Sequence, residues 1–137
     1  MVSAISTNLS EIDEVYPRIY MSGYGPAKDW ITIKSLAITH ILTVTPYANP
    51  LFKEEGVKYL IFDEISDNGA QQILQYFERS NEFIRNALAE NETNKVLVHC
   101  AAGISRSGAF CCAYMIQEGK MTLKAALEYG KARRTNF

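Results

Sequence analysis

The chain has 137 residues, of which 47% are hydrophobic and 21% are charged, a composition that excludes a disordered or collagen-like protein. Its 14 basic and 15 acidic residues give a net charge of -1, which argues against binding to nucleic acid or a membrane through overall positive charge. The longest apolar run, residues 109–116, is too short to cross a bilayer, and no secretory signal is visible at the N-terminus.

Strand and helix patterns alternate along the first half of the chain. Residues 18–21 form a short strand candidate, and Pro26 is well placed to begin a helix on which apolar side chains recur to Ala37. Residues 39–45 are rich in β-branched side chains and predict a buried strand. Residues 57–62 predict a further strand.

The second half continues this alternation. A polar loop over residues 63–71 precedes an amphipathic helix that extends to about Glu90. The apolar run 96–98 predicts a strand buried on both faces, and helices follow over about 106–118 and 122–133. We expect a single α/β domain over residues 1–137, with a core of about 10–135. Its central sheet should be mainly parallel, with four to five strands flanked by helices.

Cysteine usage indicates a reducing compartment. The three cysteines include no C-x-x-C pair, and the two histidines complete no zinc-ligand spacing. We therefore expect free thiols, no metal site, and a cytoplasmic location from which the nucleus is reached by diffusion. Cys111 and Cys112 lie at helical spacing among apolar residues, which favours core packing over a role as resolving thiols.

The reactive chemistry is concentrated where strand 96–98 leads into a helix. His99 and Cys100 follow the strand, a short loop containing Gly103 comes next, and Arg106 opens the helix. Backbone N–H groups of such a loop can turn inward and, with the helix N-terminus, bind an anion. The arginine fork suits two phosphate oxygens, and the same donors would favour the cysteine thiolate, a nucleophile.

Cys100 alone is more simply interpreted as a core residue, and Arg106 as a surface arginine. Their spacing in VHCAAGISRSG, between a strand and a helix, favours a phosphate-binding thiolate loop. This motif resembles the signature of the cysteine-dependent protein phosphatases, in particular the dual-specificity branch. Residues 17–45, 65–84 and 113–134 are similar to the family's first strands, acid loop and closing helices.

The resemblance implies a metal-independent, cofactor-free phosphatase of phosphotyrosine and phosphoserine or phosphothreonine monoesters. Cys100 would form a thiophosphoryl intermediate, and Ser107 would donate a proton to the sulfur when it leaves. His99 would support the loop from behind. The phosphate would be held by the loop residues Ala101, Ala102, Gly103, Ile104, Ser105 and Arg106.

The general acid is expected in the loop after strand 57–62. Asp67 lines up without a gap on the family's acid-loop pattern, whereas Asp63 would need a gap. Without the resemblance, either aspartate is interpreted as a helix cap or a solvated turn residue.

Other residues have mainly structural interpretations. His40 begins a strand, and Trp30 is expected in the core. Tyr24 and Tyr47 are weak candidates for the rim of the pocket. Arg133 and Arg134 are interpreted as complements of a helix dipole, with contact to an acidic substrate as the alternative.

The sequence departs from the family's pattern in two places. Thr43 stands where members often have asparagine, and the chain stops at Phe137, where members continue with a Pro-Asn turn and a final helix. The expected partner is a phosphorylated protein, with a kinase as one candidate, and the oligomeric state stays open. Two alternatives also stay open: a phosphopeptide-binding module without turnover, and a phosphatase of a non-protein phosphate ester.

Overall fold

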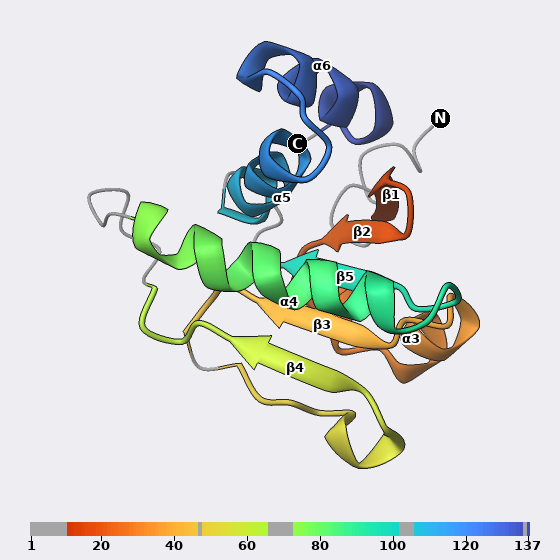
Figure 1. Cartoon of the computed structure of the whole chain (residues 1–137). Coiled ribbons are helices and arrows are strands. Elements are labelled where there is room, and N and C mark those ends of the chain that lie inside the picture. The colour runs from red at the N-terminus through yellow and green to blue at the C-terminus, as the bar shows by residue number, and fades with distance from the viewer. Residues whose placement is uncertain (1–10, 47, 66–72, 102–105, 136) are drawn as a thin grey trace.

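The computed structural model describes residues 11–46, 48–65, 73–101, 106–135 and 137. Its elements alternate between strands and helices, as the sequence predicts (Figure 1). In chain order they are β1 (Ile12–Tyr16), β2 (Ile19–Ser22), α2 (Tyr24–Ala27), α3 (Trp30–Ser35), β3 (His40–Thr43), η1 (Lys53–Glu55), β4 (Lys58–Ile61), η2 (Leu74–Tyr76), α4 (Phe77–Glu90), β5 (Val96–His99), α5 (Arg106–Gln117) and α6 (Leu123–Arg133).

The five strands form one sheet in the order β1-β2-β5-β3-β4, with β5 in the centre. β5 pairs in parallel with β2 and β3, and β3 pairs in parallel with β4, so the predicted mainly parallel sheet is confirmed. Only β1, which is antiparallel to β2, was absent from the prediction. Its sequence IDEVY buries a single residue, Val15, so it carries no clear apolar pattern.

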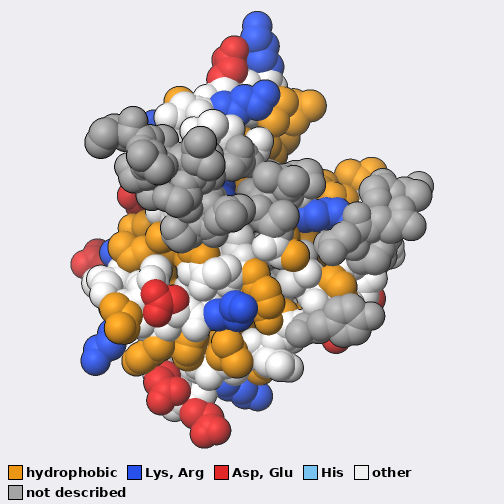
Figure 2. Space-filling model, turned by 180° about the vertical axis from the view of Figure 1, so that it is seen from behind, with side chains coloured by type: hydrophobic (Ala, Val, Ile, Leu, Met, Phe, Trp, Pro, Cys, Tyr) orange, Lys and Arg blue, Asp and Glu red, His pale blue; other side chains and the backbone are white. Residues whose placement is uncertain are grey.

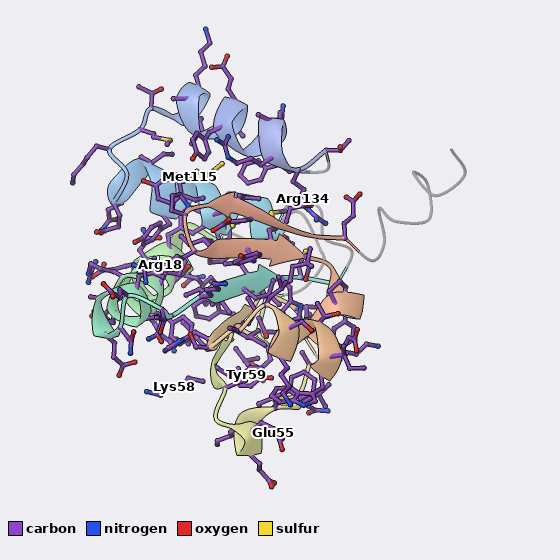
Figure 3. All side chains as sticks on the ribbon, turned by 90° about the vertical axis from the view of Figure 1, so that its right-hand side faces the viewer. Arg18, Glu55, Lys58, Tyr59, Met115 and Arg134 are labelled. Atoms are coloured by element: carbon purple, nitrogen blue, oxygen red, sulfur yellow. The ribbon has the colours of Figure 1, made fainter. Side chains whose placement is uncertain are left out.

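The core has two parts, one on each face of the sheet. Successive side chains of a strand point to opposite faces, so Ile41 and Leu97 pack with Ile33 of α3, whereas Leu42 and Val98 pack on the other face. That other face is covered by α4 and α5. Figure 3 shows α4 and the α2–α3 segment on opposite sides of the sheet.

The predicted helix from Pro26 to Ala37 is wrong in its extent, because two short helices occupy that segment. α2 begins at Tyr24, and Asp29, with φ -100 and ψ 105, separates it from α3. The Asp29 carboxylate accepts a hydrogen bond of 2.6 Å from the Thr32 hydroxyl, a bond that supports the start of a new helix. Trp30 packs against the core of this face, as predicted, with its ring 5.0 Å from that of Phe52.

Two arginines tie distant segments together (Figure 3). Arg18 donates hydrogen bonds to the carbonyl oxygens of Leu88, Asn91 and Asn94 at 3.1–3.2 Å, at the C-terminal end of α4. Arg134, only 3% exposed, donates to the Asp13 carboxylate at 2.7 Å and joins the end of α6 to β1. Arg134 is therefore a structural residue, and its buried position is wrong for contact with an acidic substrate.

The face seen from behind carries charges of both signs among hydrophobic side chains (Figure 2). On this face the described lysines and arginines are scattered and do not gather in one basic patch. None of the described helices has the length and apolarity that a bilayer crossing requires.

Candidate active site

Cys100 lies directly after the central strand, where parallel strands end and α5 approaches the sheet. It is 3% exposed, and its Sγ lies 3.5 Å from the Oγ of Ser107, which is fully buried. Because Ser107 is the second residue of α5, this contact links the strand end to the first turn of the helix. The ends of parallel strands next to helix N-termini are where α/β proteins bind anionic ligands.

The chain around Cys100 is held from both sides. The backbone N–H of Tyr24 donates a hydrogen bond of 3.1 Å to the carbonyl oxygen of Ala101, and the N–H of Val44 donates one of 2.9 Å to the carbonyl of His99. Arg106, half-buried, is the first residue of α5. The predicted phosphate-binding residues Ala102, Gly103, Ile104 and Ser105 lie outside the described residues, so the anion nest stays a prediction.

His99, the residue before Cys100, is buried, with 3% of its surface exposed. Its Nε2 forms a hydrogen bond of 2.9 Å with the hydroxyl of Thr43 on the neighbouring strand. Thr43 therefore supports the histidine that precedes Cys100, although asparagine is frequent at this place in the family. Burial lowers the pKa of His99 to about 4, and the Cys100 backbone opposes part of that shift. The imidazole is consequently neutral at pH 7.

Tyr24 contacts this histidine, which sequence reasoning missed. Its ring is parallel to that of His99, with the centroids 5.9 Å apart and an angle of 4° between the planes. The sequence placed Tyr24 only at a pocket rim, because nothing local shows that the first residue of α2 meets the last residue of β5. Tyr47, the other rim candidate, lies outside the described residues.

The remaining cysteines are core residues, as predicted. Cys111 and Cys112 are 1% and 5% exposed and belong to the apolar cluster beneath α5. Burial raises the pKa of both thiols, so they stay protonated at neutral pH. Buried, protonated thiols are poor nucleophiles, which further weakens a resolving role.

The structure does not decide between the two acid candidates. Asp63 is exposed in the turn after β4, while Asp67 lies outside the described residues. Residues on both sides of Asp63 are held in place. The N–H of Phe62 donates to the Thr43 carbonyl at 2.8 Å, and Ile65 is buried at 1% exposure. Residues 62–65, which precede Asp67, are therefore fixed beside β3, whose Thr43 bonds His99.

Arg133 contacts its own helix. It donates a hydrogen bond of 3.0 Å to the carbonyl oxygen of Tyr129, and its guanidinium lies 3.4 Å from the centroid of the Tyr129 ring. This agrees with the predicted complement to the helix C-terminus. Among the residues that the structure describes, no three His, Cys, Asp or Glu side chains gather as a metal site would require.

Comparison with known sequences identifies similar proteins. The family model described as Dual specificity phosphatase, catalytic domain, matches residues 19–137. The tyrosine-protein phosphatase yvh1 of Schizosaccharomyces pombe is 35% identical over 130 residues, which are 95% of this chain and 38% of that protein. Human dual specificity protein phosphatase 9 is 35% identical over 127 residues, which are 90% of this chain and 32% of that protein. The chain thus spans well under half the length of either relative.

Solved structures share the fold. The human tyrosine phosphatase-like serine/threonine/tyrosine-interacting protein superposes with a TM-score of 0.81 at 31% identity, covering 92% of this chain and 85% of that one. The crystal structure of DUSP15 gives a TM-score of 0.80 at 28% identity, covering 88% of this chain and 74% of that one. These TM-scores show that the α/β fold of this chain is shared with both structures.

Proposed function

The chain belongs to the dual-specificity phosphatase family, and from that membership we propose that it hydrolyses phosphate monoesters of proteins with Cys100 as the nucleophile. The observation that carries the proposal is the placement of Cys100. Its thiol sits at the carboxyl end of the central strand, 3.5 Å from the Ser107 hydroxyl, and α5 begins one residue earlier at Arg106. Family membership supplies the reaction class, and this geometry supplies the reacting groups.

In the first step, the Cys100 thiolate attacks phosphorus in line with the ester oxygen. A P–S bond forms and the P–O bond to the substrate breaks. Asp67 gives its proton to the departing oxygen, which matters most for an alkoxide because it is a poor leaving group. Arg106 and the loop N–H groups hold the equatorial oxygens while charge is redistributed over them.

In the second step, water attacks phosphorus, the P–S bond breaks and phosphate is released. Asp67, now ionised, takes a proton from the attacking water. The sulfur leaves as a thiolate, and the Ser107 hydroxyl, fully buried beside it, stabilises that charge by donating a hydrogen bond. His99 and Thr43 keep the strand end rigid through their 2.9 Å hydrogen bond.

The substrate class follows from family membership and from the loop side chains. Phosphoproteins are the substrates that the family implies. The loop carries alanine, isoleucine and serine but no lysine, which disfavours a polyphosphorylated lipid or RNA 5′-triphosphate. We therefore propose both phosphotyrosine and phosphoserine or phosphothreonine as substrates, with a kinase as one candidate.

A reducing compartment fits the thiols. None of the three cysteines forms a disulfide, and Cys100 must be reduced to act as a nucleophile. We infer a cytoplasmic location with access to the nucleus, which imaging of a fluorescent fusion would test.

The deciding experiment is steady-state hydrolysis of p-nitrophenyl phosphate in EDTA, followed by phosphotyrosyl and phosphothreonyl peptides. Cys100→Ser should lower turnover by a factor of about 10⁴ or more, because an alcohol replaces the nucleophilic thiolate. Cys112→Ser is the matched control, a buried cysteine of α5 outside the proposed site, and should retain turnover. Asp67→Asn should be most damaging on the phosphothreonyl peptide.

Each outcome separates one alternative. Full activity of Asp67→Asn on the phosphothreonyl peptide would assign the acid role to Asp63. Native protein that is folded and reduced but does not turn over would favour the phosphopeptide-binding module. Preference for a non-protein ester over both peptides would overturn the substrate class and leave the thiolate chemistry in place.

A further inference from the structure

Tyr24 contacts the residues on both sides of the nucleophile. Its aromatic ring lies parallel to His99, 5.9 Å between centroids, and its backbone N–H donates to the carbonyl oxygen of Ala101 at 3.1 Å. The two contacts come from different parts of one residue. A side-chain substitution therefore removes the ring and leaves the backbone hydrogen bond available, which makes the role of the ring testable by itself.

His99 is enclosed by neighbours from several elements. Ser22 of β2 and Thr43 of β3 stand beside it in the sheet, and Thr43 bonds its Nε2. The Tyr24 ring lies parallel to the imidazole, with the ring centroids 5.9 Å apart. Tyr24 is half-buried and His99 is only 3% exposed, so of the two parallel rings it is the tyrosine whose residue still reaches solvent.

Resting on the proposed phosphatase function, we propose that Tyr24 is a positioning residue whose ring covers His99 and keeps that imidazole dry, uncharged and fixed behind Cys100. The low pKa of His99, about 4, agrees with this role, since burial is its largest cause. A smaller side chain at position 24 that lets water reach the imidazole of His99 would reduce the burial that lowers its pKa.

None of the described neighbours of His99 in the sheet changes charge near neutral pH. Ser22, Thr43 and Ser107 are uncharged hydroxyls, and Arg106 at the start of α5 is a permanent cation. The Lys28 ammonium of α2 lies 4.3 Å from the centroid of the Tyr24 ring and adds positive charge on that side. Cys100, the next residue along the chain, is the group whose charge matters for turnover.

An uncharged His99 has a functional consequence. A cation beside Cys100 would hold the thiolate in an ion pair, and a more stabilised thiolate is intrinsically less nucleophilic. It would also make the reaction depend on a second ionisation near the working pH. When the His99 imidazole is uncharged, the groups that stabilise the Cys100 thiolate are the loop, the N-terminus of α5 and Arg106.

The test is an NMR titration of the His99 imidazole in native protein, Tyr24→Phe and Tyr24→Leu, each also carrying Cys100→Ser so that turnover plays no part. His40→Gln assigns the resonance, since the chain has two histidines. Native protein and Tyr24→Phe should titrate alike, because both keep an aromatic cover. In Tyr24→Leu the pKa of His99 should rise by about 1 unit or more toward its ordinary value.

Kinetics on the same variants with Cys100 intact provide the second readout. In Tyr24→Leu, kcat/KM should fall about tenfold and acquire an added inflection between pH 5 and 7, and Tyr24→Phe should restore the native profile. Tyr24→Met, which removes the flat ring at similar volume, replaces Tyr24→Leu if the latter does not fold.

An unchanged His99 titration in folded Tyr24→Leu or Tyr24→Met would overturn the proposal. So would a Tyr24→Phe protein as impaired as Tyr24→Leu, because the hydroxyl would then carry the role. The titration does not use turnover, so an inactive native protein with the expected NMR result would refute the proposed function and leave the cover of His99 established.

Discussion

The two histidines of the chain lie at opposite ends of neighbouring parallel strands, and each meets a different environment. His40 is the first residue of β3 and His99 is the last of β5. They are 6% and 3% exposed, and each forms a hydrogen bond with a threonine, Thr39 at 2.8 Å and Thr43 at 2.9 Å. By burial and first hydrogen bond alone they would be hard to tell apart.

The two histidines differ in their other neighbours. His40 Nε2 lies 3.9 Å from a carboxylate oxygen of Glu90, and the ring packs edge-on against Phe83. Burial and Lys58 lower the pKa of His40, while Glu90 raises it. His99 instead meets the flat ring of Tyr24 and the Cys100 backbone. At the amino end of the sheet, charged side chains therefore act on the buried histidine, whereas at the carboxyl end the histidine is kept neutral beside the proposed nucleophile.

The largest expected effect is on the pH dependence of stability. The unfolded chain protonates His99 below about pH 6.5, whereas the folded chain does so only below about 4. The free energy of unfolding should therefore fall by about 3 kcal/mol as the pH drops through that window. Urea denaturation at pH 7, 5.5 and 4.5 measures this.

His99→Gln should flatten the pH dependence, and His40→Gln should keep most of it. If both variants flattened the pH dependence of stability equally, the comparison would fail, because folding would then lower the pKa of His40 as much as that of His99.

The next effect concerns the serine of the catalytic end. Ser107→Ala removes the hydroxyl 3.5 Å from the Cys100 sulfur, so the thiophosphoryl intermediate should break down about 10–100-fold more slowly. A burst of p-nitrophenol followed by slow turnover would show this in rapid-mixing experiments. Ser80→Ala, at an equally buried serine of α4, is the control and should leave the rate unchanged. An unaltered kcat in Ser107→Ala would remove Ser107 from the mechanism.

Paired threonine variants sharpen the comparison further. Thr43→Val removes the hydrogen bond between Thr43 and the buried His99, and should cost about 1–2 kcal/mol of stability and about tenfold in kcat/KM. Thr39→Val, at the amino end, should cost similar stability because the Thr39 hydroxyl also bonds the Lys95 backbone. It should leave kcat/KM unchanged. If Thr39→Val lost activity and Thr43→Val did not, the proposal that the active site lies at the carboxyl end of the sheet would be contradicted.

The smallest effect belongs to Glu90. Its charge raises the pKa of His40, so Glu90→Gln should lower that pKa further, with no change in turnover. A titration of His40 by NMR reports the shift. Lys58 and Glu90 are both exposed and act on His40 in opposite directions, so salt would screen both charges, and the variant is the measurement that isolates Glu90. A rise in the pKa of His40 would contradict the assigned sign.

Much of the fold could be predicted from the sequence because it depends on local patterns of residues. The apolar run 96–98 and the β-branched segment 39–45 predicted the strands that became β5 and β3. The alternation of strands with helices predicted a parallel sheet, and a parallel sheet places its binding end at the carboxyl ends of the strands. Strand β1 and the division between α2 and α3 were missed, because a single buried residue and one aspartate carry those features.

The sequence by itself determined the reactive segment. The proposed reactive side chains lie within eight residues of one another, at Cys100, Arg106 and Ser107. The short connection from strand to helix therefore keeps them close together in space. The tertiary structure alone decided which residues support them. Thr43 is 56 residues from His99 and Tyr24 is on another helix, yet both contact its ring. Arg134 is buried and forms a hydrogen bond with Asp13, 121 residues away in the chain. Such contacts depend on strand order and register, and these arise only when the whole sheet assembles.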